Sequence, residues 1–97
     1  MVTYMSLMKL TDQGIKNVKE APERIEAGLK AFEKTGGKLI GIWISIGKYD
    51  YVSIGESASD EAALAWAVGL SSQGNVRVKS VKLYSKEQFA GLIKMLP

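Results

Sequence analysis

A small set of side chains in this sequence combines residue types that could bind a small ligand or move a proton. Tyr49 and Asp50 are neighbours in the sequence Gly-Lys-Tyr-Asp, and a tyrosine beside a carboxylate could hydrogen-bond a ligand or assist proton transfer. The alternative is turn chemistry, in which the Asp50 carboxylate accepts backbone N–H groups and Tyr49 packs beside a hairpin. A second group offers aromatic rings and hydroxyl groups, which suit a small, flat, apolar ligand. Its members are Tyr4, Ser6, Trp43, Ser45, Tyr51 and Ser53.

Several kinds of chemistry are excluded within one chain by the composition. The sequence contains no His and no Cys, so imidazole bases, Ser-His-Asp triads, thiolate nucleophiles and the usual zinc sites are absent. The carboxylates of Asp12, Asp50, Glu56 and Asp60 match no metal-binding loop. We therefore expect no metal and no cofactor. The net charge of +3 is modest, and we expect no nucleic-acid partner.

Hydrophobic periodicity predicts alternating strands and helices. Pro22 cannot lie inside a helix, which predicts a short helical turn over 12–19 and a second helix that starts near Pro22 and ends at Gly36-Gly37. Ser59 is a good N-cap for a helix that ends at Gly74, and Ser85-Lys86-Glu87-Gln88 matches a capping box. Strands are predicted over residues 2–9, 38–46, 50–57 and 76–84.

This order is βαββαβ followed by a C-terminal helix, which is the ferredoxin-like arrangement. We expect an α+β fold with a four-stranded antiparallel sheet, and one domain over residues 1–97. Right-handed crossovers would place both main helices on one face of the sheet.

The other face of the predicted sheet has an unusual composition for a surface in water. Strand alternation predicts that the helices cover Thr3, Met5, Leu7, Ile40, Ile42, Ile44, Val52 and Ile54. The open face would then carry Val2, Tyr4, Ser6, Met8, Leu39, Trp43, Ser45, Tyr51 and Ser53. Such a face favours packing against a second copy. We expect a homodimer or a higher homo-oligomer, with the uncharged helix around Trp66 as a further contact.

Four motifs, in order along the chain, resemble the GYD domain family, which takes its name from the Gly-x-Tyr-Asp corner. They are residues 9–14, 19–24, 36–39 and 47–50, and residues 74–77 extend the likeness, so that it covers essentially the whole chain. The resemblance implies a dimeric α/β-barrel, in which two ferredoxin-like sheets pack face to face. It implies no activity.

We expect an oligomeric small-molecule binding or assembly module without catalysis, whose ligand would be small and apolar or aromatic. The alternative is a cofactor-free oxygenase or isomerase that acts on a small aromatic or carbonyl compound in the barrel interior. A packed interior would favour assembly, whereas a void of a few hundred Å³ that contains a hydrogen-bonded Tyr or Asp would favour the enzyme. No stretch approaches the roughly 20 apolar residues of a membrane span, and no secretory signal is recognisable, so we expect a cytoplasmic protein without membrane association.

Overall fold

The computed structural model describes every residue from Met1 to Pro97 and confirms the predicted order of elements. The elements are β1 (Val2–Leu10), α1 (Asp12–Lys16), a short 3-10 helix η1 (Val18–Glu20), α2 (Ala21–Lys34), β2 (Lys38–Ile44), β3 (Tyr51–Ser57), α3 (Asp60–Ser72), β4 (Val76–Leu83) and α4 (Lys86–Ile93).

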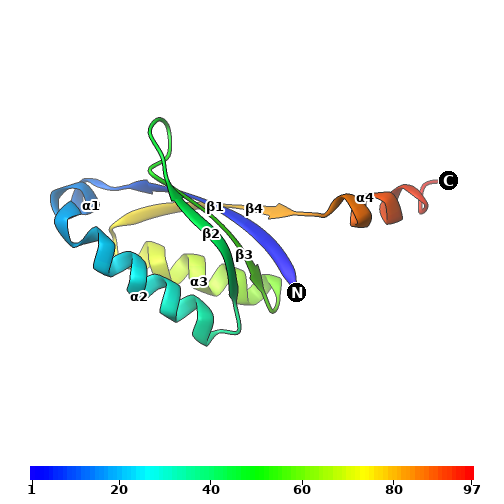
Figure 1. The fold of residues 1–97 in the computed structure, drawn as a ribbon, viewed down its shortest axis with the longest axis horizontal. Helices are drawn as coiled ribbons and strands as arrows, with labels where there is room; N and C mark the ends of the chain where they lie inside the picture. The colour runs from blue at the N-terminus through cyan, green and yellow to red at the C-terminus, as the bar shows by residue number, and fades with distance from the viewer.

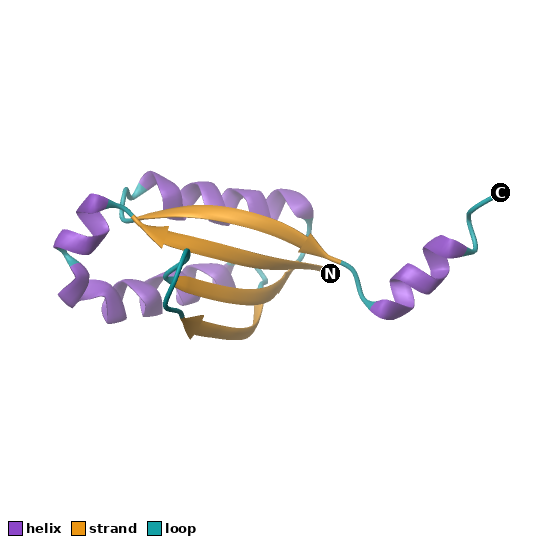
Figure 2. Ribbon diagram, turned by 90° about the horizontal axis from the view of Figure 1, so that it is seen from above, coloured by secondary structure: helices purple, strands orange, loops and turns teal.

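The strands form one antiparallel sheet in the order β2-β3-β1-β4. Both long helices, α2 and α3, lie side by side against one face of this sheet (Figure 1). Figure 2 looks onto the opposite face, where the strands lie in front of the helices and no element covers them. The sheet has two free edges, β2 and β4, so it is not closed within one chain.

The helix boundaries follow the local signals in the sequence. Pro22 lies in the first turn of α2, where a missing N–H is harmless. The side chains of Thr11 and Ser59 accept hydrogen bonds from the first turns of α1 and α3. Gly36 and Gly74 adopt φ values of 87° and 84° just after α2 and α3, a conformation that other residues rarely adopt.

The prediction of which residues lie under the helices is wrong for β1 and β3. In β2 it is wrong at Leu39, which was expected on the open face but pairs with Gly55 and lines a void beside Phe32. Ile42 pairs with Ser53 and Trp43 pairs with Val52, and paired residues share a face. A bulge between Leu39 and Gly41 shifts the register of β2. Ile42 therefore lies under the helices as predicted, but on the same face as Ser53. The helix-covered face carries Tyr4, Ser6, Met8, Tyr51, Ser53, Gly55 and Ser57.

Small residues on the covered face make room for large helix side chains. Ser6, Ser53 and Ser57 are all buried, and a Cβ atom placed on Gly55 would lie 3.0 Å from the ring of Phe32. The Phe32 ring of α2 packs against Trp66 of α3 with 5.1 Å between ring centroids. The core of the chain is therefore the layer between these two helices and the sheet.

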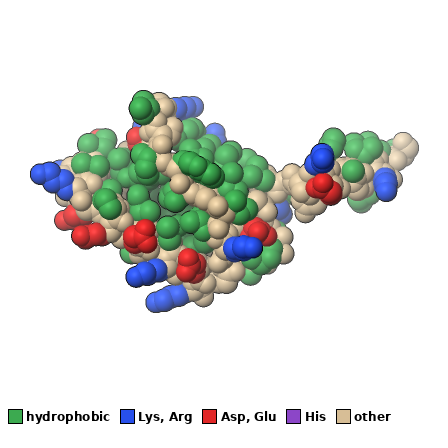
Figure 3. Space-filling model, in the orientation of Figure 1, with side chains coloured by type: hydrophobic (Ala, Val, Ile, Leu, Met, Phe, Trp, Pro, Cys, Tyr) green, Lys and Arg blue, Asp and Glu red, His purple; other side chains and the backbone are tan.

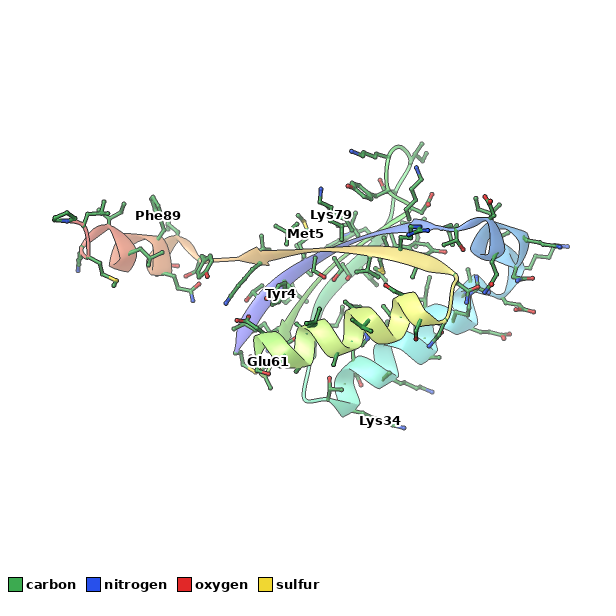
Figure 4. The ribbon with its side chains drawn as sticks, turned by 180° about the vertical axis from the view of Figure 1, so that it is seen from behind. Tyr4, Met5, Lys34, Glu61, Lys79 and Phe89 are labelled. Carbon is green, nitrogen blue, oxygen red and sulfur yellow. The ribbon has the colours of Figure 1, made fainter.

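The uncovered side of the sheet, which we call the open face, is apolar at its centre. Trp43 is 53% exposed there, and Figure 4 shows Met5 and Lys79 projecting away from the helices while Tyr4 projects toward them. The paired residues that share this face are Thr3, Met5, Leu7, Lys9, Lys38, Gly41, Trp43, Val52, Ile54, Glu56, Arg77, Lys79, Val81 and Leu83. An apolar uncovered face was predicted, but except for Trp43 its residues are different ones.

The chain ends in an extension that leaves the rest of the molecule, which we call the body. Residues 84–97, which include α4, form an arm that continues the line of β4 away from the sheet (Figures 1 and 2). No helix of this chain has the length and apolar character needed to span a membrane.

Candidate functional site

A small cavity lies between the sheet and the two long helices. Its volume is about 60 Å³, and hydrophobic side chains form most of its wall. Tyr51 and Ser53 line it from β3, Trp66 from α3 and Arg24 from α2. A neighbouring void of about 20 Å³ is lined by Tyr4, Ser6 and Ser53. These volumes accommodate a few water molecules at most.

The structure brings together only part of the aromatic and hydroxyl set. Tyr4, Ser6, Tyr51 and Ser53 gather under the helices, inside one chain, whereas we expected them between two sheets. These four residues therefore lie on the side of the sheet that the helices cover and not on the side available to a partner sheet.

The remaining candidates lie outside the cavity. Trp43 lies on the open face, where its ring covers Gly41 so closely that a Cβ atom there would lie 2.6 Å from the ring. Ser45 is exposed in the loop between β2 and β3, and Tyr49 is half-buried near the end of that loop. Ile46, the last residue of the strand predicted over 38–46, lies outside β2 and is fully exposed in the loop.

Asp50 ties the hairpin corner to the end of β1. Its carboxylate accepts a hydrogen bond from the Leu10 backbone N–H at 2.8 Å. The Asp50 backbone N–H donates to the Met8 carbonyl at 2.9 Å, and the Ser45 N–H donates to the Asp50 carbonyl at 2.8 Å. The two backbone contacts continue the β1–β3 and β2–β3 ladders past their last pairs, and the carboxylate adds a side-chain contact beyond them. The Asp50 contacts match the turn chemistry that we gave as the alternative to ligand binding at this corner.

Two further motifs meet next to this corner. The Thr11 N–H donates to the Asn75 carbonyl at 3.0 Å, and the Thr11 hydroxyl donates to the Gly74 carbonyl. The Gln13 side-chain amide donates to the Asn75 side chain at 3.1 Å. Gly14 packs so tightly that a Cβ atom there would lie 2.1 Å from the Asn75 carbonyl oxygen. Residues 9–14, 47–50 and 74–77, which are distant in sequence, thus fix one end of the sheet together.

A polar cluster that the sequence did not reveal lies at the opposite end of β1. The Tyr4 hydroxyl donates to Asp60 at 2.9 Å, and the Lys82 ammonium donates to the same carboxylate at 3.0 Å. The hydrogen bond from Lys82 and that from Tyr4 lower the pKa of Asp60. The hydrogen bond to Asp60 raises the pKa of Tyr4 and that of Lys82. Tyr4 and Lys82 are neighbours because the β1–β4 register pairs them. This pairing is not visible in the sequence.

Arg24 is a second group that sequence reasoning missed. Its Nη1 donates to the Asn17 carbonyl at 2.9 Å and lies 3.6 Å from the Glu20 carboxylate. Its Nη2 is buried without a hydrogen-bond partner. Arg24 thus supports the turn before α2 and adds a positive charge to the wall of a mostly apolar cavity.

Trp66 joins the two long helices and does not lie on the outer surface. Its indole N–H donates to the Gly28 carbonyl of α2 at 3.1 Å. Trp66 packs within its own chain, so it is not the residue through which this helix could make the predicted further contact between copies. The outward side of α3 instead exposes Leu64 and Val68.

The fold and these sites describe a ferredoxin-like α+β protein with a nearly filled core and an apolar open face. The model of the GYD domain family matches residues 4–93. The chain belongs to the GYD domain family.

A curated relative is the glutamine synthetase and cystathionine beta-lyase binding protein of Thermus thermophilus. The two sequences are 32% identical over 84 residues, which cover 84% of this chain and 87% of the relative. No solved structure matches the chain.

Proposed function

We propose that this chain is a non-catalytic binding module that works as a homodimer closed through its open face and that binds another protein. The apolar open face carries the first part of the proposal. Met5, Val52 and Ile54 lie at its centre on neighbouring strands, and sheets bury such faces against a second sheet about 10 Å away. Two copies packed in this way would form the α/β-barrel that the family resemblance implies.

The relative supports the second part of the proposal. Its name states that it binds glutamine synthetase and cystathionine beta-lyase, both of which are proteins and not small molecules. A module that binds proteins needs exposed surface more than an internal cavity. Once the open faces are paired, the outward side of α3 with Leu64 and Val68 would remain available for such a partner.

The cavity gives the enzyme alternative less support. An aromatic or carbonyl substrate needs a pocket of about 300 Å³ or more, whereas the cavity beside Tyr51 measures about 60 Å³. The hollow beside the hydrogen-bonded Tyr4 and Asp60 measures about 290 Å³, but only six residues line it and that hydrogen bond is exposed. Native mass spectrometry of freshly purified protein tests this alternative. We expect the mass of protein alone, and a small molecule retained in stoichiometric amount would favour the enzyme.

Calorimetric titration tests the binding function directly. The chain would be titrated into purified glutamine synthetase and purified cystathionine beta-lyase from its own organism. An unrelated acidic enzyme serves as control because the chain carries a net charge of +3. We expect saturable binding to at least one of the two enzymes that persists in about 300 mM salt, where exposed charges are largely screened. Absence of binding to both would contradict the proposal.

A further inference from the structure

The C-terminal arm, residues 84–97, extends from the body without a hydrogen bond or ion pair to it, and at its start the Lys82 ammonium lies 5.5 Å from the centre of the Tyr84 ring. Every hydrogen bond of the arm joins residues of the arm itself. The molecule measures 53 × 30 × 20 Å, and its radius of gyration is 14.9 Å, whereas a compact chain of this length has about 12.5 Å. Figures 1 and 2 show that the arm accounts for this elongation.

The arm is a defined helix with an apolar side. Its start is fixed by a capping box, in which the Ser85 hydroxyl accepts from the Gln88 N–H at 3.0 Å and the Gln88 side chain accepts from the Ser85 N–H at 2.6 Å. Its apolar residues lie exposed, and Phe89 reaches 60%. They are Phe89, Leu92, Ile93, Met95 and Leu96. An isolated helix of this length is marginal in water, so the arm needs a surface to pack on.

Phe89 of the arm lies on the same side of the molecule as the open face. In Figure 4, Phe89 projects in the same direction as Met5 and Lys79, opposite to Tyr4. The space-filling view also shows hydrophobic side chains along the upper side of the arm (Figure 3). Val81 and Leu83 of β4 lie on the open face beside Met5 and Thr3. The apolar surface of the sheet therefore continues along β4 toward the arm.

The open face alone is small for a stable interface. Strands of seven to nine residues are about 25 Å long, and four strands span about 19 Å, which gives a projected area of about 480 Å². A standard interface takes about 800 Å² from each partner. The helix of the arm is about 12 Å long and 10 Å wide. If each copy donates one arm and receives the other, these two added contacts bring the interface area of each copy close to that size.

We infer that the arm clasps a second copy packed on the open face, so that Phe89 and Leu92 of each chain contact the body of the other. This inference rests on the proposed homodimer. Two-fold symmetry then makes each copy both donate and receive one arm. Folding the arm back onto its own open face would require a reversal within residues 84–85, where the chain continues straight from β4 into α4 (Figure 1).

Photo-crosslinking with isotope mixing tests the exchange of arms. Phe89 would be replaced by benzoylphenylalanine in the full chain, and isotopically labelled and unlabelled copies would be mixed before irradiation. We expect crosslinked peptides that join one labelled and one unlabelled chain, from residue 89 to the body of the second copy. Benzoylphenylalanine at Ile15, which is 57% exposed on α1, is the control and should give no such product.

The outcomes separate this inference from the homodimer itself. If crosslinks form only within one chain, or if none form in a protein that sediments as a dimer, the clasp is contradicted and the proposed homodimer is not affected. A protein that sediments as a monomer would overturn both. Crosslinks to other proteins or to lipid in a crude extract, without chain-to-chain products, would overturn the clasp and assign the arm a different partner.

Paired substitutions give a second measurement. We expect Phe89→Ser with Leu92→Ser to raise the dissociation constant of the dimer about tenfold or more. Lys86→Ser with Lys94→Ser alters the same helix at charged residues and should change that constant less than about twofold. Because all four side chains lie outside the body, circular dichroism should show both variants folded. An unchanged dissociation constant for the first pair would contradict the clasp.

Discussion

The carboxylate of Asp50 accepts a hydrogen bond from the backbone N–H of Leu10 at 2.8 Å, across 40 residues of sequence. Leu10 is the last residue of β1, and Asp50 directly precedes β3. The contact therefore fixes where two neighbouring strands end relative to each other. This places the Tyr-Asp corner among the residues that set the sheet register.

Removal of the Asp50 carboxylate should destabilise the fold. We expect Asp50→Ala to lower the free energy of unfolding by about 1–2 kcal/mol, because the half-buried Leu10 N–H loses its charged partner. Asp50→Asn keeps an acceptor oxygen and should lose less. Denaturant unfolding of both variants checks this. If the denaturation midpoint of Asp50→Ala is at or above that of wild type, Asp50 does not stabilise the fold, and the corner becomes a candidate ligand site.

Gly14 should tolerate no side chain, because its Cα approaches the Asn75 carbonyl too closely. A Cβ atom would lie 2.1 Å from that oxygen, which belongs to the backbone and cannot rotate away. We expect Gly14→Ala to lower the free energy of unfolding by about 1–3 kcal/mol. Gly69→Ala is the matched control, since a Cβ atom there meets nothing within 4 Å. This control should gain about 0.5–1 kcal/mol from helix propensity, and equal effects of the two substitutions would refute the close-packing argument.

The contribution of Asp60 to stability should depend on pH. The pKa of Asp60 is lowered in the folded state, chiefly by the hydrogen bond from Lys82. Its stabilisation is therefore present above the pKa of the unfolded state and is lost as the pH falls through the folded value. We expect Asp60→Asn to lower the melting temperature at about pH 7, and we expect this difference from wild type to shrink as the pH falls below the usual pKa of an aspartate.

The neighbouring carboxylate provides the control for this titration. Glu61→Gln removes a charge from the same first turn of α3, where Glu61 has no hydrogen-bond partner. Its melting temperature should follow wild type more closely over the same pH range. A difference between Asp60→Asn and wild type that stays constant with pH would contradict the assigned pairing.

The order and ends of the elements were predictable because local chemistry sets them. Pro22, Gly36, Gly74 and Ser85 act through their own backbone or side chain, and each marks a boundary in the structure. The face assignment failed because register is not local. The loop over 45–50 decides which side of β3 shares a face with Ile42, and the bulge near Ile40 places Leu39 on that same face. A shift of one residue moves every side chain to the other face.

The candidate site was only half predictable for a related reason. Sequence reasoning grouped Tyr4, Ser6, Tyr51 and Ser53 by alternation, and they do share a face. It could not anticipate that the small residues on that face leave room for Phe32 and Trp66. Packing between a helix and a sheet depends on the shapes of both layers, and only one layer is visible in a strand pattern.

Sedimentation equilibrium at micromolar concentration tests most directly the claim that the open face joins two copies. We expect a mass about twice the 10.6 kDa of one chain. Val52→Lys places a charge on the open face between Leu7 and Trp43 and should shift the protein to monomer. Val18→Lys makes the same change at an exposed position in η1 and should leave the dimer intact. A wild-type chain that sediments as a folded monomer would contradict the account.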